Sequence, residues 1–177
     1  KYNVVISTDG NGTTNQTGTK SIGIEGISIT ATPEIGSAFK QWEVTGGAKV
    51  ANATSATTTI TATSAGTVKA VFEEKPATTI YLEPTGHWNS DKAVFQAHVW
   101  QTGKTGVNLD MEGIGDPSHA DGDNKSPHRY YKVEVPYGYD EILFFRKSTD
   151  GTTIWNQTGD LTIPTDNKTL YVITDNT

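Results

Sequence analysis

Residues 27–31 read Ile-Ser-Ile-Thr-Ala, so three apolar side chains alternate with two hydroxyl side chains. This period of two predicts a strand with one buried and one solvent-exposed face. The same alternation returns over residues 57–63, around Ile60 and Ala62. No segment keeps an apolar period of 3.6 residues for three turns, so we expect little helix. The pattern predicts an all-β protein.

The composition points to the same fold class. Among 177 residues there are 29 threonines, 18 glycines and 7 prolines, and only 19% of the residues are charged. Thr suits a half-exposed strand, whereas Gly and Pro suit the turns between strands. The chain has no Cys, which excludes disulfides, thiolate zinc sites and a cysteine nucleophile.

Charge and hydropathy narrow the classes of partner. With a net charge of -6, a nucleic-acid partner is not expected, because binding to phosphates needs surplus Lys and Arg. No apolar run approaches the roughly 20 residues of a membrane span, so we expect no membrane insertion. Lys1 is an unusual native start, which fits an exported protein whose signal peptide has been removed.

The chain changes character near residue 76. Residues 1–76 hold six Lys and six acidic residues, whereas residues 77–177 hold eight basic and fourteen acidic residues. Twelve of the sixteen aromatic residues and all four His lie in the second part. The charged segment 73–77, which contains Pro76, separates the two compositions. We therefore expect two domains, residues 1–75 and residues 78–177.

The first part is expected to be a meander of short strands, with Asp9-Gly10-Asn11-Gly12 as a turn. Trp42 is a candidate ligand platform, but a domain this small needs a large central residue, which favours a core position. Three stretches are informative in their order: YNVVISTDGNGT (2–13), ISITATPEIGSAFKQWEV (27–44) and GTVKAVFEE (66–74). They resemble the bacterial surface repeat related to internalin B-repeats. The resemblance implies a small Ig-like β module that serves as a spacer, on a bacterial secreted or cell-surface protein.

The second part contains six strand candidates, which favour a β-sandwich. They are residues 78–82, 93–100, 130–135, 141–146, 161–163 and 169–173.

Aromatic residues give this part its strongest functional signal. In the strand around Ala97-His98-Val99-Trp100, a core position for Val99 would place His98 and Trp100 outward together. Trp155-Asn156-Gln157 is expected in a loop, with an indole beside two amides. An exposed ring can stack on a pyranose while amides and His pair with its hydroxyls. The alternative is that Trp100 and Trp155 simply fill the sandwich.

Catalysis and metal binding are weaker alternatives. A glycosidase needs two carboxyl groups about 5–10 Å apart across a cleft, and its candidates are Glu83, Asp91, Asp140, Glu141 and Asp160. The serines lack a Gly-x-Ser-x-Gly context. Asp121 and Asp123 are candidate Ca²⁺ ligands, although the loop lacks EF-hand order and a solvated polar loop is favoured. We expect no enzymatic activity of its own and no cofactor, and no effect of EDTA.

Four stretches of the second part resemble starch-binding carbohydrate-binding modules of families 26 and 25. They are IYLEPTGHWNSDKAVFQAHVWQTG (80–103), ME (111–112), YYKVEVPYGYDEILFFR (130–146) and WNQTGDLTIP (155–164). The resemblance implies a jelly-roll-like β-sandwich that binds α-1,4-linked glucans through a shallow aromatic platform. The residues carried over are His98, Trp100, Trp155, Gln157 and Trp88.

The sequence therefore predicts a monomeric fragment of a multidomain secreted or surface protein, a spacer followed by an α-glucan-binding module. Whether that protein includes a glycoside hydrolase is left open. The alternative is a structural or adhesive surface fragment that does not bind sugar.

Overall fold

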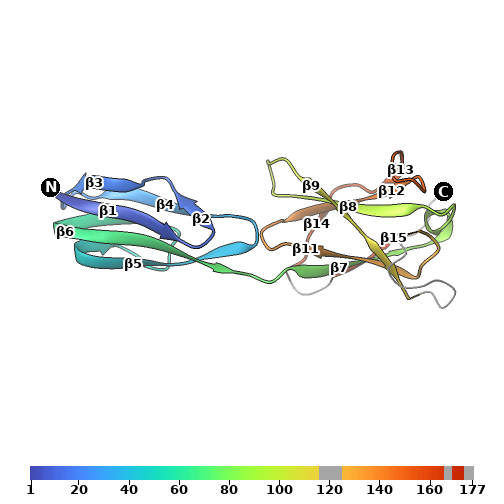
Figure 1. Ribbon diagram of the computed structural model, residues 1–177, viewed down its shortest axis with the longest axis horizontal. Coiled ribbons are helices and arrows are strands. Elements are labelled where there is room, and N and C mark those ends of the chain that lie inside the picture. Colours follow the sequence, from blue (N-terminus) through green and yellow to red (C-terminus); the bar gives the residue numbers. More distant parts are fainter. Residues whose placement is uncertain (116–124, 166–168, 174–177) are drawn as a thin grey trace. The chain divides into compact units, whose positions relative to one another are not determined.

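The computed structural model describes residues 1–115, 125–165 and 169–173. It is built from strands, and the only helical turn in these ranges is a short 3-10 helix, η1 (Gly86–Asn89). The chain divides into two compact units, Lys1–Pro76 (unit 1) and Ala77–Thr177 (unit 2). The predicted fold class, all-β, is confirmed (Figure 1).

Unit 1 is a six-stranded sheet in the order β2-β4-β6-β1-β3, with β5 paired to β6. Its strands are β1 (Tyr2–Asp9), β2 (Gly12–Thr14), β3 (Gly18–Ile22), β4 (Ile27–Pro33), β5 (Ser37–Val50) and β6 (Thr57–Glu74).

The prediction of a meander of short strands is wrong for unit 1. Strand β1 runs parallel to β6 and antiparallel to β3, and β5 and β6 are 14 and 18 residues long. The first half of β6 pairs with β4 and its second half pairs with β1, while β5 runs along both halves. The partners of one strand therefore change along its length, which local sequence patterns do not reveal.

The core of unit 1 follows from the period of two in β6. Ile60, Ala62, Val68, Ala70 and Phe72 are all buried, because every second residue points to the same face. Trp42 is 3% exposed, and its indole N–H donates to the Ser55 carbonyl over 2.8 Å. The core position expected for Trp42 is confirmed. Gly12 is required where it stands, since a Cβ there would lie 2.4 Å from the ring of Phe72.

Unit 2 has two sheets that share one core, which is the arrangement of a β-sandwich. The first sheet has the order β10-β11-β7-β15, and the second has the order β13-β12-β8-β9 with β14 paired to β12 (Figure 1). The strands are β7 (Thr78–Pro84), β8 (Val94–Trp100), β9 (Val107–Asp110), β10 (Glu112–Ile114), β11 (Tyr130–Val135), β12 (Glu141–Lys147), β13 (Ile154–Gln157), β14 (Leu161–Thr162) and β15 (Leu170–Ile173).

The inward residues of β7, β8, β11 and β12 meet in this core. Ile80 and Leu82 come from the first sheet, and Ala97, Ile142 and Phe144 come from the second; all five are fully buried. The six predicted strands are all present within one or two residues of their predicted ends. Strands β9, β10 and β13 were not predicted.

Because each unit has a core of its own, we expect residues 1–76 and 77–177 to fold when they are produced separately. Circular dichroism melts of the two pieces should each show a cooperative transition. A piece that shows no transition would mean that its core depends on the rest of the chain.

Tyr171 provides a prediction at alkaline pH. Its ring meets Phe144 edge-on at 5.2 Å, and its hydroxyl donates to the Thr162 carbonyl over 2.8 Å. Burial raises the pKa of Tyr171 to about 12, whereas an unfolded tyrosine has a pKa near 10. The folded state favours the neutral phenol, so the free energy of unfolding should fall as the pH rises from about 10 to 12. The protein and its Tyr171→Phe variant can each be titrated by ultraviolet absorbance. The difference between the two titration curves should show one tyrosine that ionises near pH 12. Ionisation of this group near pH 10 would contradict the prediction.

Candidate functional site

The outer face of the second sheet of unit 2 carries the predicted pair of rings. In β8, Phe95, Ala97 and Val99 are buried in the core, while Gln96, His98 and Trp100 alternate with them and are partly exposed. The expectation that Val99 points inward and that His98 and Trp100 point outward together is confirmed. Both rings are therefore available at the surface.

A third ring extends this pair. The centroids of His98 and Trp100 lie 5.4 Å apart, and the centroid of Phe145 lies 6.1 Å from that of His98. Phe145 belongs to β12, which is the neighbour of β8 in the sheet. The preceding residue, Phe144, is buried in the core, so the period of two places Phe145 on the outer face. Sequence reasoning did not select Phe145, although this alternation was a usable signal.

Two contacts fix the orientation of His98. Its Nδ1 lies 2.6 Å from Oδ1 of Asn108, the residue directly opposite on β9. Because an amide oxygen only accepts, Nδ1 is the donor, and in the neutral ring Nε2 is the acceptor. A Cβ on Gly106 would lie 2.6 Å from this Nε2. Gly106 therefore lets the chain pass close to the His98 ring.

Gln157 lies on the same face as these rings. It is exposed in β13 and stands directly opposite Phe145, so the two side chains leave the sheet on the same side. The structure thus brings together His98, Trp100 and Gln157 with Phe145 between them. The expected loop at residues 155–157 is wrong, because these residues form an edge strand.

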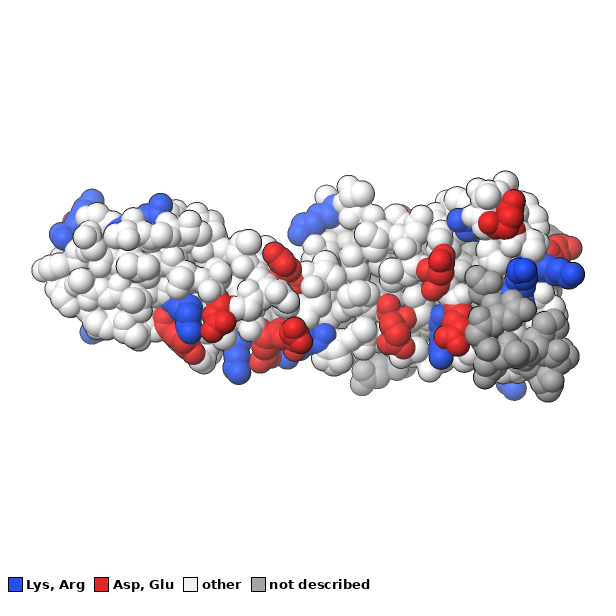
Figure 2. Space-filling model, viewed as in Figure 1, with Lys and Arg blue, Asp and Glu red and all other residues white. Residues whose placement is uncertain are grey.

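A shallow hollow of about 380 Å³ adjoins the rings. Besides His98 and Trp100, it is lined by Lys104, Thr105, Gly106, Leu143 and Asp160. We call it the His98–Trp100 hollow. It combines ring faces with an ammonium, a hydroxyl and a carboxylate, which can donate to and accept from the hydroxyls of a bound molecule. Figure 2 shows basic and acidic side chains interspersed over one face of each unit, without a broad basic patch on that face.

Trp155 lies elsewhere. Its ring, 42% exposed, stacks on the guanidinium of Arg146, with the guanidinium carbon 4.8 Å from the ring centroid. A second hollow, of about 530 Å³, adjoins this ring and is lined by Lys125, Ser148, Thr149 and Asp150 in addition to Trp155. We call it the Trp155 hollow. It shares no lining residue with the His98–Trp100 hollow.

The assignment of Trp88 to the binding platform does not fit the structure. Trp88 belongs to η1 and is only 8% exposed, and its ring stacks on the core residue Phe95 at 6.4 Å between centroids. Its carbonyl accepts a hydrogen bond from Nε of Arg146 over 3.1 Å. The 3-10 turn directs the indole inward, so its ring faces are covered by protein rather than offered to a sugar.

Two of the acidic candidates are neighbours: the Thr102 hydroxyl lies 3.2 Å from Oδ2 of Asp140 and 3.5 Å from Oε1 of Glu141. Asp160 lines the His98–Trp100 hollow, Asp91 is paired with Arg146 at 2.7 Å, and Asp140 accepts hydrogen bonds from the backbone N–H and hydroxyl of Thr102. The Ca²⁺ candidates Asp121 and Asp123 lie outside the described residues. In the ranges that the structure describes, no group of three or more His, Asp or Glu side chains is placed to hold a metal ion.

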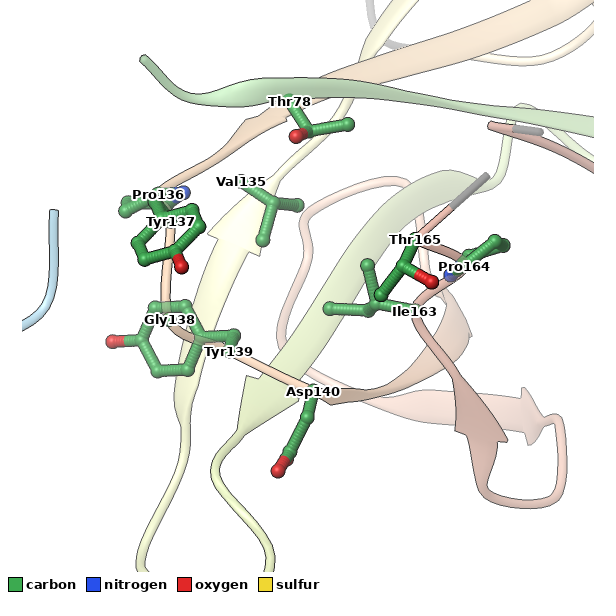
Figure 3. Close-up of a pocket in the computed structure, with 10 residues that line it drawn as sticks. All are labelled: Thr78, Val135, Pro136, Tyr137, Gly138, Tyr139, Asp140, Ile163, Pro164 and Thr165. Carbon is green, nitrogen blue, oxygen red and sulfur yellow. The ribbon is translucent and has the colours of Figure 1, made fainter. Parts of the chain in front are cut away.

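A cleft at one end of the sandwich was not predicted at all. It measures about 390 Å³, and Tyr137 and Tyr139 stand on one side of it, opposite Ile163, Pro164 and Thr165 (Figure 3). Its walls are mostly apolar, and it shares no lining residue with either of the other two hollows. Tyr137 is 47% exposed, so it provides an aromatic control outside the candidate site.

Comparison with known proteins bears on unit 1. The family model of the divergent InlB B-repeat domain matches residues 2–76, which is essentially the whole unit. This match supports the resemblance found in residues 1–75. No curated protein and no solved structure matches the chain. The resemblance of residues 78–177 to starch-binding modules stays a prediction.

No helix in the described part of the chain is long and apolar enough to cross a membrane.

Proposed function

We propose that unit 2 is a non-catalytic module that binds α-glucan on the outer face of its second sheet. The observation that carries this proposal is the row of three partly exposed rings, Trp100, His98 and Phe145, with 5.4 and 6.1 Å between neighbouring centroids. A soluble domain normally buries such rings, and an exposed row beside polar groups marks a binding surface.

The chemistry of the row suits a sugar. The C–H face of a pyranose is apolar and packs on an indole or phenyl ring, while its equatorial hydroxyls need donors and acceptors at the rim. Gln157 beside Phe145, and Lys104, Thr105 and Asp160 in the His98–Trp100 hollow, supply them. The preference for α-1,4-linked glucose rests on the resemblance to starch-binding modules, since the rings alone fit many pyranoses.

Unit 1 has a different role in this proposal. Its match to a B-repeat domain supports a spacer on a bacterial secreted or cell-surface protein. Trp42 and Phe72 are buried in its core and Phe39 packs against that core, so these three rings are not free to stack on a ligand. Tyr2 is 44% exposed, but it is a single ring and not part of a row. The sugar-binding surface is therefore assigned to unit 2 alone.

Calorimetry of the chain with maltoheptaose tests the proposal, with cellohexaose as the control for linkage. On a shallow surface the ligand covers only part of each ring, so we expect weak binding, with a Kd of about 10 μM to 1 mM for maltoheptaose. We expect cellohexaose to bind at least about tenfold more weakly, because a β-1,4 chain is straight and presents its rings differently. Equal affinity for both would replace the proposed ligand by a broader class of glucan. No binding of either would leave a structural or adhesive role.

A further inference from the structure

Trp155 has an exposed side chain, and the Arg146 guanidinium supports one face of its ring. One face of its indole lies on the Arg146 guanidinium at 4.8 Å, and the ring is 42% exposed. A surface Trp usually loses rotational freedom when it binds a ligand, and this loss weakens binding. A ring that is already fixed on a cation avoids much of that loss, and its other face can accept a ligand.

Arg146 is itself fixed by an unusual number of partners. It is only 4% exposed. Its guanidinium donates to five groups: the Trp88 carbonyl at 3.1 Å, the Ser90 carbonyl at 3.1 Å, the Ser90 hydroxyl at 3.3 Å, the Asp91 carboxylate at 2.7 Å and the Asn156 amide oxygen at 3.3 Å. A planar fork held at this many points cannot swing, so it makes a rigid support for the indole above it.

The backbone beside this support is strained. Asp91 and Lys92 have φ angles of 62° and 52°, in the left-handed region that residues with a Cβ seldom adopt. Such strain persists only where surrounding contacts impose it, and it gathers at functional sites. The Asp91 side chain is bound by Arg146, and its carbonyl accepts from the Thr149 hydroxyl over 3.3 Å. Thr149 lines the Trp155 hollow, so these contacts join the strained pair to that hollow.

The Trp155 hollow also has polar groups for hydroxyls. Ser148, Thr149 and Asp150 line it beside the ring. Hydrogen bonds from the Ser148 hydroxyl and from the Thr152 backbone and hydroxyl all end on Oδ1 of Asp150, and they lower the pKa of Asp150 to about 2. Asp150 is therefore a fixed carboxylate acceptor at ordinary pH. An aromatic face with hydroxyl and carboxylate neighbours is suited to one or two pyranose rings.

We propose that the Trp155 hollow is a second, independent sugar-binding site, which makes unit 2 bivalent for α-glucan. This inference rests on the proposed function of the His98–Trp100 hollow. The two hollows share no lining residue, so each should bind a short oligosaccharide without the other. A polysaccharide that reaches both sites should bind more tightly than a short ligand, because its second contact is intramolecular.

The indole N–H signals in NMR spectra of the whole chain report on each Trp separately. During titration with maltotriose, the signals of Trp100 and Trp155 should both shift, whereas those of the buried Trp42 and Trp88 should stay in place. In Trp155→Ala, maltotriose should still shift the Trp100 signal, with a Kd within about twofold of the original. In Trp100→Ala, the Trp155 signal should still shift. Affinity for soluble starch should fall about tenfold or more in either variant.

Three results overturn the proposal, and they differ from one another. A Trp155 signal that never shifts leaves one site and spares the proposed function. A Trp155 response that disappears in Trp100→Ala shows one continuous site instead of two. If neither signal shifts, the proposed function fails as well. Arg146→Lys provides a check on positioning, because it keeps the charge but loses the planar fork. It should weaken the Trp155 response and leave the Trp100 response unchanged, and equal loss at both signals would indicate a general structural defect.

Discussion

Replacing Trp100 by Ala should lower the affinity of the His98–Trp100 hollow for maltoheptaose by about 10- to 100-fold, or about 1.4–2.7 kcal/mol of binding free energy. Trp100 contributes the largest ring face of the row, and Trp is among the residues that most often supply a large share of the energy of a binding site. The weak binding that remains should come from His98 and Phe145, and from the Trp155 hollow. Calorimetry with maltoheptaose measures the change.

The stability of the protein should hardly change in Trp100→Ala. The ring is partly exposed on the outer face of the sheet, so its removal opens no cavity in the core. The matched control is Tyr137→Ala, which removes an aromatic ring of 47% exposure from the cleft at the end of the sandwich. This control should keep the original affinity. If both variants lose binding equally, the rings act through the fold rather than through contact with the sugar.

Patterns within a strand were predictable, whereas the partners of a strand were not. The inward position of Val99 and the outward position of His98 and Trp100 follow from a period of two that any reader of the sequence can count. That Phe145 and Gln157 lie beside these rings depends on the order and register of β8, β12 and β13. Register is set by packing and by turns, and the paired residues of β8 and β12 are 41 to 53 positions apart in the sequence.

Unit 1 shows the same limit. The alternation over residues 57–63 predicts strand, but it does not tell that β1 would pair in parallel with the second half of β6. Parallel partners are remote in sequence by necessity, because the chain has to return to its starting side before they can pair. A meander was therefore the simplest interpretation of the local signals, and the wrong one.

The hydrogen-bond network around the buried residue Arg146 of unit 2 was harder to predict than the outward-facing rings. Arg146 alternates with Phe144 in β12 and so points to the core side, where a charged residue is rarely found without partners. Its acceptors come from the segment that ends at Asp91 and from β13, which are 55 and 10 residues away in sequence. No local pattern announces such a network. Without it, the stacking that separates Trp155 from the His98–Trp100 hollow could not be foreseen.

Trp88→Ala should have the opposite effect to Trp100→Ala, a large loss of stability with little loss of affinity. The indole of Trp88 is 8% exposed and stacks on Phe95, so truncation leaves a cavity in a packed core. Replacement of a buried Trp by Ala costs about 3–5 kcal/mol. This is a large part of the roughly 5–15 kcal/mol by which a domain is stable. The Trp88 carbonyl stays in place to accept from Arg146, so the network beneath Trp155 keeps its main-chain partner.

Urea unfolding followed by methyl NMR signals separates this loss from any global effect. The midpoint reported by Ile80 and Ile142, which are core residues of unit 2, should move to lower urea in Trp88→Ala. The midpoint reported by Ile29 and Ile60 in the core of unit 1 should stay where it is, since that core is separate. At low temperature and without urea, the variant should bind maltoheptaose with nearly the original affinity. A stable variant that has lost binding would return Trp88 to the sugar-binding surface and show that the indole turns outward when a ligand is present.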